Sequence, residues 1–105
     1  MKNINEEITL AYLEQRAQLG KATDINYLME TLATTTSFLH SKMIDYALGR
    51  VTNEEGRERI KYFLFNGNKI QRNYAALYFK RQGACGIIDE AFEQGCIDHV
   101  QAYAK

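Results

Sequence analysis

The chain has 105 residues, of which 46% are hydrophobic, so it is short enough for one domain and apolar enough to form a core without disulfides or metal. Thirteen basic residues balance thirteen acidic residues, and the formal net charge is zero. This neutrality argues against a strong overall field for nucleic acid or membrane, and it opposes self-association only weakly. We expect a single helical domain that spans residues 1–105.

Two features of the sequence predict a cytoplasmic protein that makes no membrane contact. The segment "KNINEEITL" after Met1 lacks the apolar run of a signal peptide, and no apolar stretch approaches the roughly 20 residues of a transmembrane helix. The two cysteines, Cys85 and Cys96, are too few for the disulfide framework of a small secreted protein. We therefore expect both thiols to be reduced.

The absence of proline favours a helical chain whose helices end at glycines. No segment shows the alternation of a β-strand. The pattern predicts an all-α fold of five or six helices, arranged as a compact irregular bundle or a short array of helical pairs. The expected stops are Gly20, Gly49, Gly67, Gly83 and Gly95.

The first predicted helix runs from about Asn5 to Leu19, and the second pattern runs from about Asp24 to Leu48. The middle of this second pattern, "ATTTS", is a poor helix former, because branched threonines lose rotamer freedom and hydroxyl groups compete for the backbone. Either one helix passes through it, or the helix breaks and Thr36 or Ser37 caps a second one. The pattern slightly favours one continuous or mildly kinked helix over 24–48.

Local signals also place the later helices. Thr52 and Glu55 have the spacing of a capping box, and Gly56 lies on an apolar face where it would permit a close approach of another helix. Asn68 is expected to cap a helix over 68–81, and Asp98 a last short helix. A further helix over about 85–94 separates them.

The segment "IQRNYAALYFKRQGACGIIDEAF" resembles the helix pairs of HEAT and armadillo repeats in its general pattern. Within the chain, "NY" recurs at an offset of 47 residues, and "IDYAL" is similar to "IDEAF" at an offset of 44. The two offsets differ and few residues match, so the pattern does not assign the chain to a family.

The candidate contact site lies on the predicted helix 68–81, where cations are opposite an apolar face. In one interpretation, the cations contact phosphates while Tyr78 or Phe79 stacks on a base. In the other, which the pattern favours, the cations form a solvated back. The cations are Lys69, Arg72 and Lys80, and the residues expected to face the core are Ile70, Tyr74, Leu77 and Tyr78.

Charge is unevenly distributed, because residues 51–82 carry seven cations and three anions, whereas residues 83–105 carry one cation and four anions. Consecutive helices joined by a short turn usually pack against each other. We therefore expect the acidic helix with Asp89, Glu90 and Glu93 to pack near the basic segment 57–81 of the same chain or of a second copy.

No motif predicts an enzyme, a cofactor or a metal site. Cys96 and His99 have a plausible zinc spacing, but a structural zinc site needs four ligands. Cys85, His99 and Asp98 supply the residue types of a cysteine enzyme without a recognisable motif.

We expect a non-enzymatic protein–protein interaction or regulatory module. Helix 24–48 and the first helix carry more apolar surface than one small core covers, and a homodimer would bury the surplus. The alternative is a nucleic-acid-binding module that uses the basic, aromatic-rich segment 57–81.

Overall fold

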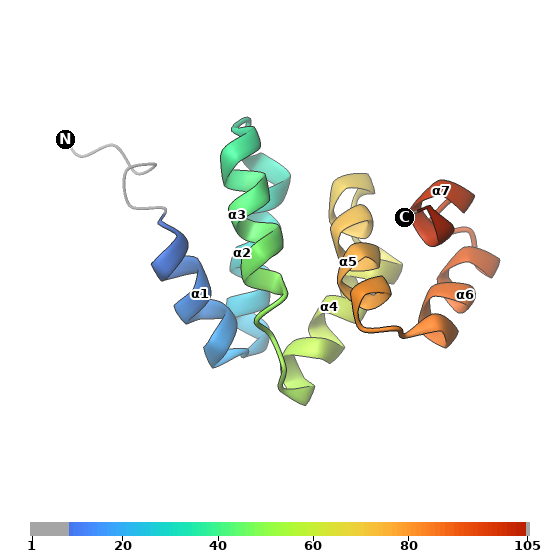
Figure 1. The fold of residues 1–105 in the computed structure, drawn as a ribbon, viewed down its shortest axis with the longest axis horizontal. Helices are drawn as coiled ribbons and strands as arrows, with labels where there is room; N and C mark the ends of the chain where they lie inside the picture. The colour runs from blue at the N-terminus through green and yellow to red at the C-terminus, as the bar shows by residue number, and fades with distance from the viewer. Residues whose placement is uncertain (1–8, 105) are drawn as a thin grey trace. The chain divides into compact units, whose positions relative to one another are not determined.

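A computed structural model describes residues 9–104 (Figure 1). This part of the chain forms seven α-helices and no β-strand, which confirms the all-α fold and gives one helix more than the upper expectation. The helices are α1 (Leu10–Leu19), α2 (Ala22–Thr34), α3 (Phe38–Leu48), α4 (Glu54–Asn66), α5 (Lys69–Arg81), α6 (Cys85–Glu93) and α7 (His99–Tyr103).

The chain divides into two compact units, and the boundary falls inside α4, between Arg57 and Glu58. We call the described residues 9–57 the first unit and residues 58–104 the second unit. Each unit has buried residues of its own. The expectation of one domain over residues 1–105 stays a prediction.

In the first unit, α1, α2 and α3 each contact the other two (Figure 1). Aliphatic side chains at helical spacing supply the interior, because they lose their contact with water there. The largest of these buried residues are Leu13, Ile25, Leu28, Met29, Leu32, Ile44, Leu48 and Val51.

The prediction of one continuous helix over 24–48 is wrong. The helix ends at Thr34, and a new helix begins at Phe38. Ser37 caps the second helix, since its hydroxyl oxygen accepts a hydrogen bond from the backbone N–H of His40 at 3.2 Å. The break falls at the threonine run, where the helix propensity is lowest and a serine cap is available.

The start of the first helix also differs from the prediction. Helix α1 begins at Leu10, because Thr9 has an extended backbone and its hydroxyl accepts from the N–H of Tyr12. The predicted start at Asn5 lies outside the described residues.

A close approach of backbone to backbone joins the end of α1 to the start of α4 within the first unit. Gly20 ends α1 with φ 65°, a left-handed conformation that favours glycine, and its carbonyl accepts from the Asn53 side-chain amide at 2.9 Å. A Cβ on Gly56 would lie 2.5 Å from a methyl group of Val51 and 3.1 Å from the Gly20 carbonyl oxygen. The expectation that Gly56 permits a close approach is confirmed.

The prediction of a capping box at Thr52 and Glu55 is wrong, because α4 begins only at Glu54. The carboxylate of Glu55 instead accepts from the backbone N–H of Ala22, at the start of α2, at 2.9 Å. The residue therefore caps a helix that is distant in sequence, which a local spacing rule does not detect.

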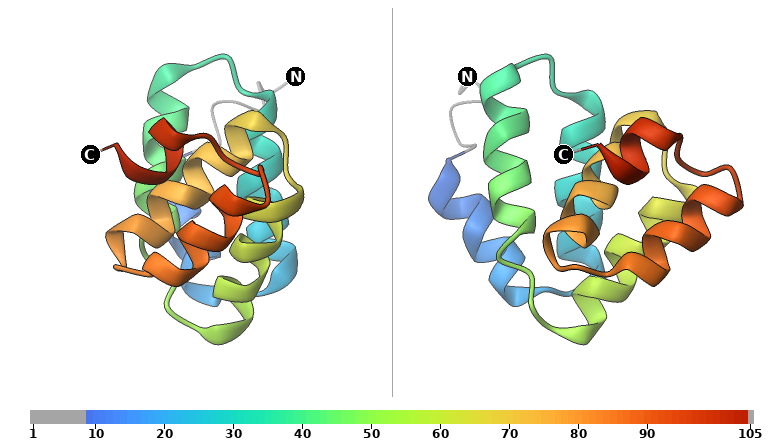
Figure 2. Two further views of the ribbon diagram at one scale, coloured as in Figure 1. Left: turned by 90° about the vertical axis from the view of Figure 1, so that its right-hand side faces the viewer. Right: turned by 45° about the vertical axis from the view of Figure 1, so that its right-hand side comes forward.

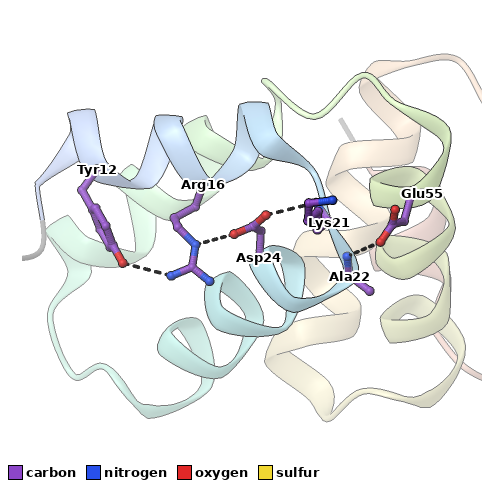
Figure 3. A network of polar contacts seen from close by, with 6 residues as sticks. All are labelled: Tyr12, Arg16, Lys21, Ala22, Asp24 and Glu55. Carbon is purple, nitrogen blue, oxygen red and sulfur yellow. Dashed lines mark hydrogen bonds and ion pairs between the residues drawn. The ribbon is translucent and has the colours of Figure 1, made fainter.

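A buried carboxylate organises the polar contacts of the first unit (Figure 3). Asp24 is 5% exposed; it accepts from Nε of Arg16 at 2.5 Å and from the N–H of Lys21 at 3.1 Å. Arg16 also donates to the Tyr12 hydroxyl, and its guanidinium lies 4.5 Å from the ring centroid of Tyr27. Burial lowers the pKa of Arg16, but the bonds to Asp24 and Tyr12 outweigh it and raise that pKa above its usual value.

In the second unit, α5, α6 and α7 each contact the other two (Figure 2). The packing of α6 against α5 confirms that the acidic helix lies beside the basic segment of the same chain. Both predicted caps are also confirmed, since Asn68 caps α5 and Asp98 caps α7. The larger buried residues of this unit are Ile60, Phe63, Leu64, Tyr78, Phe79, Ile88 and Ile97.

Candidate functional site

The face that helix α5 presents to the interior agrees only in part with the predicted one: Tyr78 is buried as expected, but the buried side is shifted. Ile70, expected in the core, is exposed, whereas Ala76, expected among the cations, is fully buried. The adjacent small residues Ala75 and Ala76 let neighbouring backbone come close on that side. The buried residues of α5 are Gln71, Ala75, Ala76, Tyr78 and Phe79.

Tyr78 and Phe79, the two rings of the predicted contact site, are both buried. Their centroids lie 5.0 Å apart at an interplanar angle of 86°, an edge-to-face pair. In this arrangement neither ring is available to stack on a base, and the nucleic-acid contact stays a prediction.

Arg72 is half-buried, and its guanidinium donates hydrogen bonds to two backbone carbonyls. Its Nε donates to the carbonyl of Gly67 at 2.6 Å, and its Nη1 donates to the carbonyl of Cys96 at 3.1 Å. Together with Lys69 it lines a small cavity of about 420 Å³, whose other lining residues are Gly95, Cys96, Ile97, Asp98 and Gln101. The predicted cation Arg72 therefore ties the start of α5 to the segment between α6 and α7.

Lys80, the third predicted cation, lies at a different cavity. Its ammonium donates to the carbonyl of Ala104 at 2.8 Å. A groove of about 760 Å³ opens beside it among α5, α6 and α7, and we call this the α5–α7 groove. Its lining is mostly apolar and comprises Leu77, Lys80, Arg81, Gly83, Ala84, Cys85, Ile88, Asp89, Ala102, Tyr103 and Ala104.

Two hydrogen bonds hold α7 in place as one wall of the groove. The Tyr103 hydroxyl donates to the Asp89 carboxylate of α6 at 2.7 Å, and Lys80 of α5 bonds Ala104. The bond to Asp89, with some burial and the negative charge of the carboxylates, raises the pKa of Tyr103. The groove therefore depends on the docking of a helix of only five residues.

The charges around the α5–α7 groove are mixed. Lys80 and Arg81 contribute two positive charges, and Asp89 contributes one negative charge that already accepts a hydrogen bond from Tyr103. Glu90, also on α6, accepts from the side-chain amide of Gln94. Asp89 and Glu90 of α6 and Lys80 of α5 thus have partners other than each other, although the two helices are neighbours.

The sulfur and imidazole groups form no evident chemical centre. Cys85 and Cys96 are both free thiols, and Cys96 is close enough to donate weakly to the Phe65 carbonyl at 3.7 Å. In residues 9–104, no three His, Cys, Asp or Glu side chains gather closely enough to hold a metal ion. His99 lies against the rings of Phe92 and Tyr103.

A second surface of interest lies on α3 in the first unit. Phe38, Leu39 and Tyr46 are 73%, 65% and 52% exposed, and we call them the α3 face. In one continuous helix over 24–48, Leu39 and Tyr46 would share an apolar stripe with Ile25 and Leu28. Because the chain breaks at 35–37, α3 instead turns Ile44, Ala47 and Leu48 inward.

Sequence reasoning identified Lys80 but missed the rest of the α5–α7 groove. Its other walls come from α6 and α7, and their approach to α5 leaves no mark in the local pattern. The sequence held one signal for the groove, the cluster of small residues "GACG" at 83–86. Small side chains fill little volume, so they leave room for an opening between helices.

Comparison with models of known protein families, with curated proteins and with solved structures found no match to this chain. Among the helices of residues 9–104, none combines the length and the apolar character that crossing a membrane requires.

Proposed function

We propose that this chain is a non-enzymatic protein–protein interaction module that self-associates as a homodimer through the α3 face. The observation that carries the proposal is the exposure of Phe38, Leu39 and Tyr46 on one short helix. Large apolar side chains that are more than half exposed and share one short helix mark a surface that another protein can cover. Scattered single residues would not carry the same weight.

A second copy of the chain is the occupant that the charge favours. The formal net charge is zero, so two copies meet without net repulsion. A two-fold interface also requires only one surface that is complementary to itself, which a single helix face provides when two helices pack against each other.

The size of the α3 face indicates weak association. Stable interfaces bury about 800 Å² per partner, and three side chains supply only part of this area. Association also costs several kcal/mol of translational and rotational freedom. We therefore expect a dissociation constant of about 10–100 μM, which suits a regulatory contact rather than a permanent dimer.

Sedimentation equilibrium over a concentration series tests the proposal. The average mass should rise towards that of a dimer, and Phe38→Ser should raise the dissociation constant by well over tenfold, since the loss of one large buried side chain costs about 1.5–3 kcal/mol and a two-fold interface loses it from both copies. The matched control is Val100→Ser, which removes a similarly exposed apolar side chain from α7 and should leave the constant unchanged.

Two results would count against the proposal. A mass that stays monomeric up to about 1 mM would remove self-association, since a constant above this value corresponds to less than about 4 kcal/mol. An equal effect of the two substitutions would remove the α3 face as the interface.

The alternative, a nucleic-acid-binding module that uses segment 57–81, has less support. Tyr78 and Phe79 are buried, and Arg72 and Lys80 donate to backbone carbonyls. A mobility shift with single- or double-stranded oligonucleotides at low salt would favour this alternative over the homodimer, and it should weaken steeply as salt rises.

The proposed location is the cytoplasm. The free thiols of Cys85 and Cys96 support it, because reducing compartments keep cysteines unpaired.

A further inference from the structure

We propose that the α5–α7 groove binds a small amphipathic molecule with an apolar chain and an anionic head group. This site lies in the second unit, and it is independent of the α3 face. Its volume of about 760 Å³ falls within the range of roughly 300–1,000 Å³ that is usual for small-molecule pockets.

The lining of the groove suits an apolar chain. Leu77 and Ile88 contribute aliphatic surface from α5 and α6, and Ala84 and Ala102 leave room between the helices because their side chains are short. Each methylene group that leaves water on such a surface strengthens binding about fourfold. A chain of several carbons therefore gains enough free energy to offset the cost of binding.

The charges at the groove favour an anionic head. Lys80 and Arg81 are consecutive in α5, and both line the groove. The ammonium of Lys80 carries three N–H donors and uses one of them in the hydrogen bond to the Ala104 carbonyl. The other donors remain for a ligand. The two cations outnumber the one carboxylate among the lining residues, Asp89, which accepts from the Tyr103 hydroxyl, so a carboxylate head meets more attraction than repulsion.

A cationic head is disfavoured by the arrangement of the nearby rings. Phe92, His99 and Tyr103 form three ring pairs with centroid separations of 5.1–6.0 Å. Rings at these distances touch one another, so an ammonium group does not fit between them as it does in an aromatic cage. The cluster packs α7 against α6, and its member Tyr103 lines the groove.

Isothermal titration with three probes of equal chain length tests the head group. The probes are octanoate, octanol and octyltrimethylammonium, each used as a monomer in solution. Octanoate should bind about fivefold more tightly than octanol, since a partly exposed ion pair contributes about 1 kcal/mol, and the ammonium probe should bind most weakly. Tightest binding of the ammonium probe, equal binding of all three, or no heat from octanoate at millimolar concentration would each overturn the proposal.

Thiol modification locates the bound probe, because the two cysteines lie at different cavities. Cys85 lines the α5–α7 groove and is exposed, whereas Cys96 lines the smaller cavity with Lys69 and Arg72. In the variants Cys96→Ser and Cys85→Ser, each with one thiol, octanoate should slow the modification of Cys85 and leave that of Cys96 unchanged. Equal protection of both thiols would overturn the assignment to the groove.

A matched pair of substitutions tests the cations. Arg81→Gln should weaken octanoate binding about two- to fivefold, towards the affinity of octanol, and leave octanol binding unchanged, since Lys80 remains at the groove. Lys69→Gln removes an exposed cation at the smaller cavity and should change neither affinity. An unchanged octanoate affinity in Arg81→Gln, or an equal loss in both variants, would overturn the role of Arg81.

Discussion

The two units of this molecule rely on polar contacts of different kinds. In the first unit, the buried carboxylate of Asp24 pairs with Arg16, and glycine lets the end of α1 touch the start of α4. In the second unit, Arg72 and Lys80 reach across to backbone carbonyls from half-exposed positions. The first kind of contact involves a buried carboxylate, whereas the second joins half-exposed cations to backbone carbonyls.

This difference indicates where the molecule tolerates change. A charge buried with its partner is costly to leave alone, so the first unit should lose much stability when one partner is removed. An exposed side chain that holds a carbonyl contributes less, because water satisfies both groups when they separate. The second unit, with its short α7, is therefore the better place for a site that must open to a ligand.

The largest effect is expected from breaking the pair at the centre of the first unit. Asp24→Ala should lower the free energy of unfolding by about 2–4 kcal/mol, because it leaves the Arg16 guanidinium and the Lys21 N–H without their buried acceptor. Urea unfolding followed by circular dichroism measures this loss.

The control for this substitution is the exposed pair of Glu14 and Arg50, whose charged atoms are 3.9 Å apart. Glu14→Gln should change the free energy of unfolding by less than about 0.5 kcal/mol, as is usual for exposed pairs. If Asp24→Ala cost no more than this, the proposed contrast between buried and exposed contacts would not hold.

An intermediate effect, of opposite sign in the two units, is expected from a pair of glycine substitutions. Gly56→Ala should destabilise by about 1–3 kcal/mol despite the better helix propensity of alanine, because the new Cβ would overlap Val51 and crowd the Gly20 carbonyl. Gly86→Ala, at a position in α6 with open space around it, should stabilise by up to about 1 kcal/mol.

Thermal unfolding of both variants under the same conditions measures this pair. Destabilisation by both would mean that α6 is covered in solution. Stabilisation by both would mean that α4 does not approach Gly20 closely.

The smallest effect concerns the bond that holds α7 in the second unit. The hydrogen bond to Asp89, with burial and nearby negative charge, raises the pKa of Tyr103, so folding favours its protonated form. The contribution of this hydrogen bond to the free energy of unfolding is therefore complete below the ordinary tyrosine pKa of about 10. It is lost as the pH rises through the raised pKa of Tyr103.

Ultraviolet titration of the phenolate measures this shift, as the difference between the natural chain and Tyr103→Phe. The difference should show one tyrosine that ionises above pH 10, and Asp89→Asn should move that ionisation to lower pH by removing the negative charge. An unchanged ionisation in Asp89→Asn would show that α7 is not held by this bond.

Local signals in the sequence determined where several of the helices begin and end. Asn68 and Asp98 accept hydrogen bonds from backbone three residues ahead, and these caps act within one helical turn. Gly20, Gly83 and Gly95 adopt the positive φ that their places at helix ends required. Such features depend on neighbours a few residues away, so the sequence states them directly.

The tertiary structure alone decided which face of each helix is buried. The pattern of α5 placed Ile70 inward and Ala76 among the cations, but the structure reverses these two positions, because the choice depended on how closely other helices approach. Likewise, the break at Ser37 set which residues α3 exposes, and Lys80 became part of a groove only because α7 docks beside it. These outcomes arise from packing between residues distant in the chain, whose free energies local propensity does not contain.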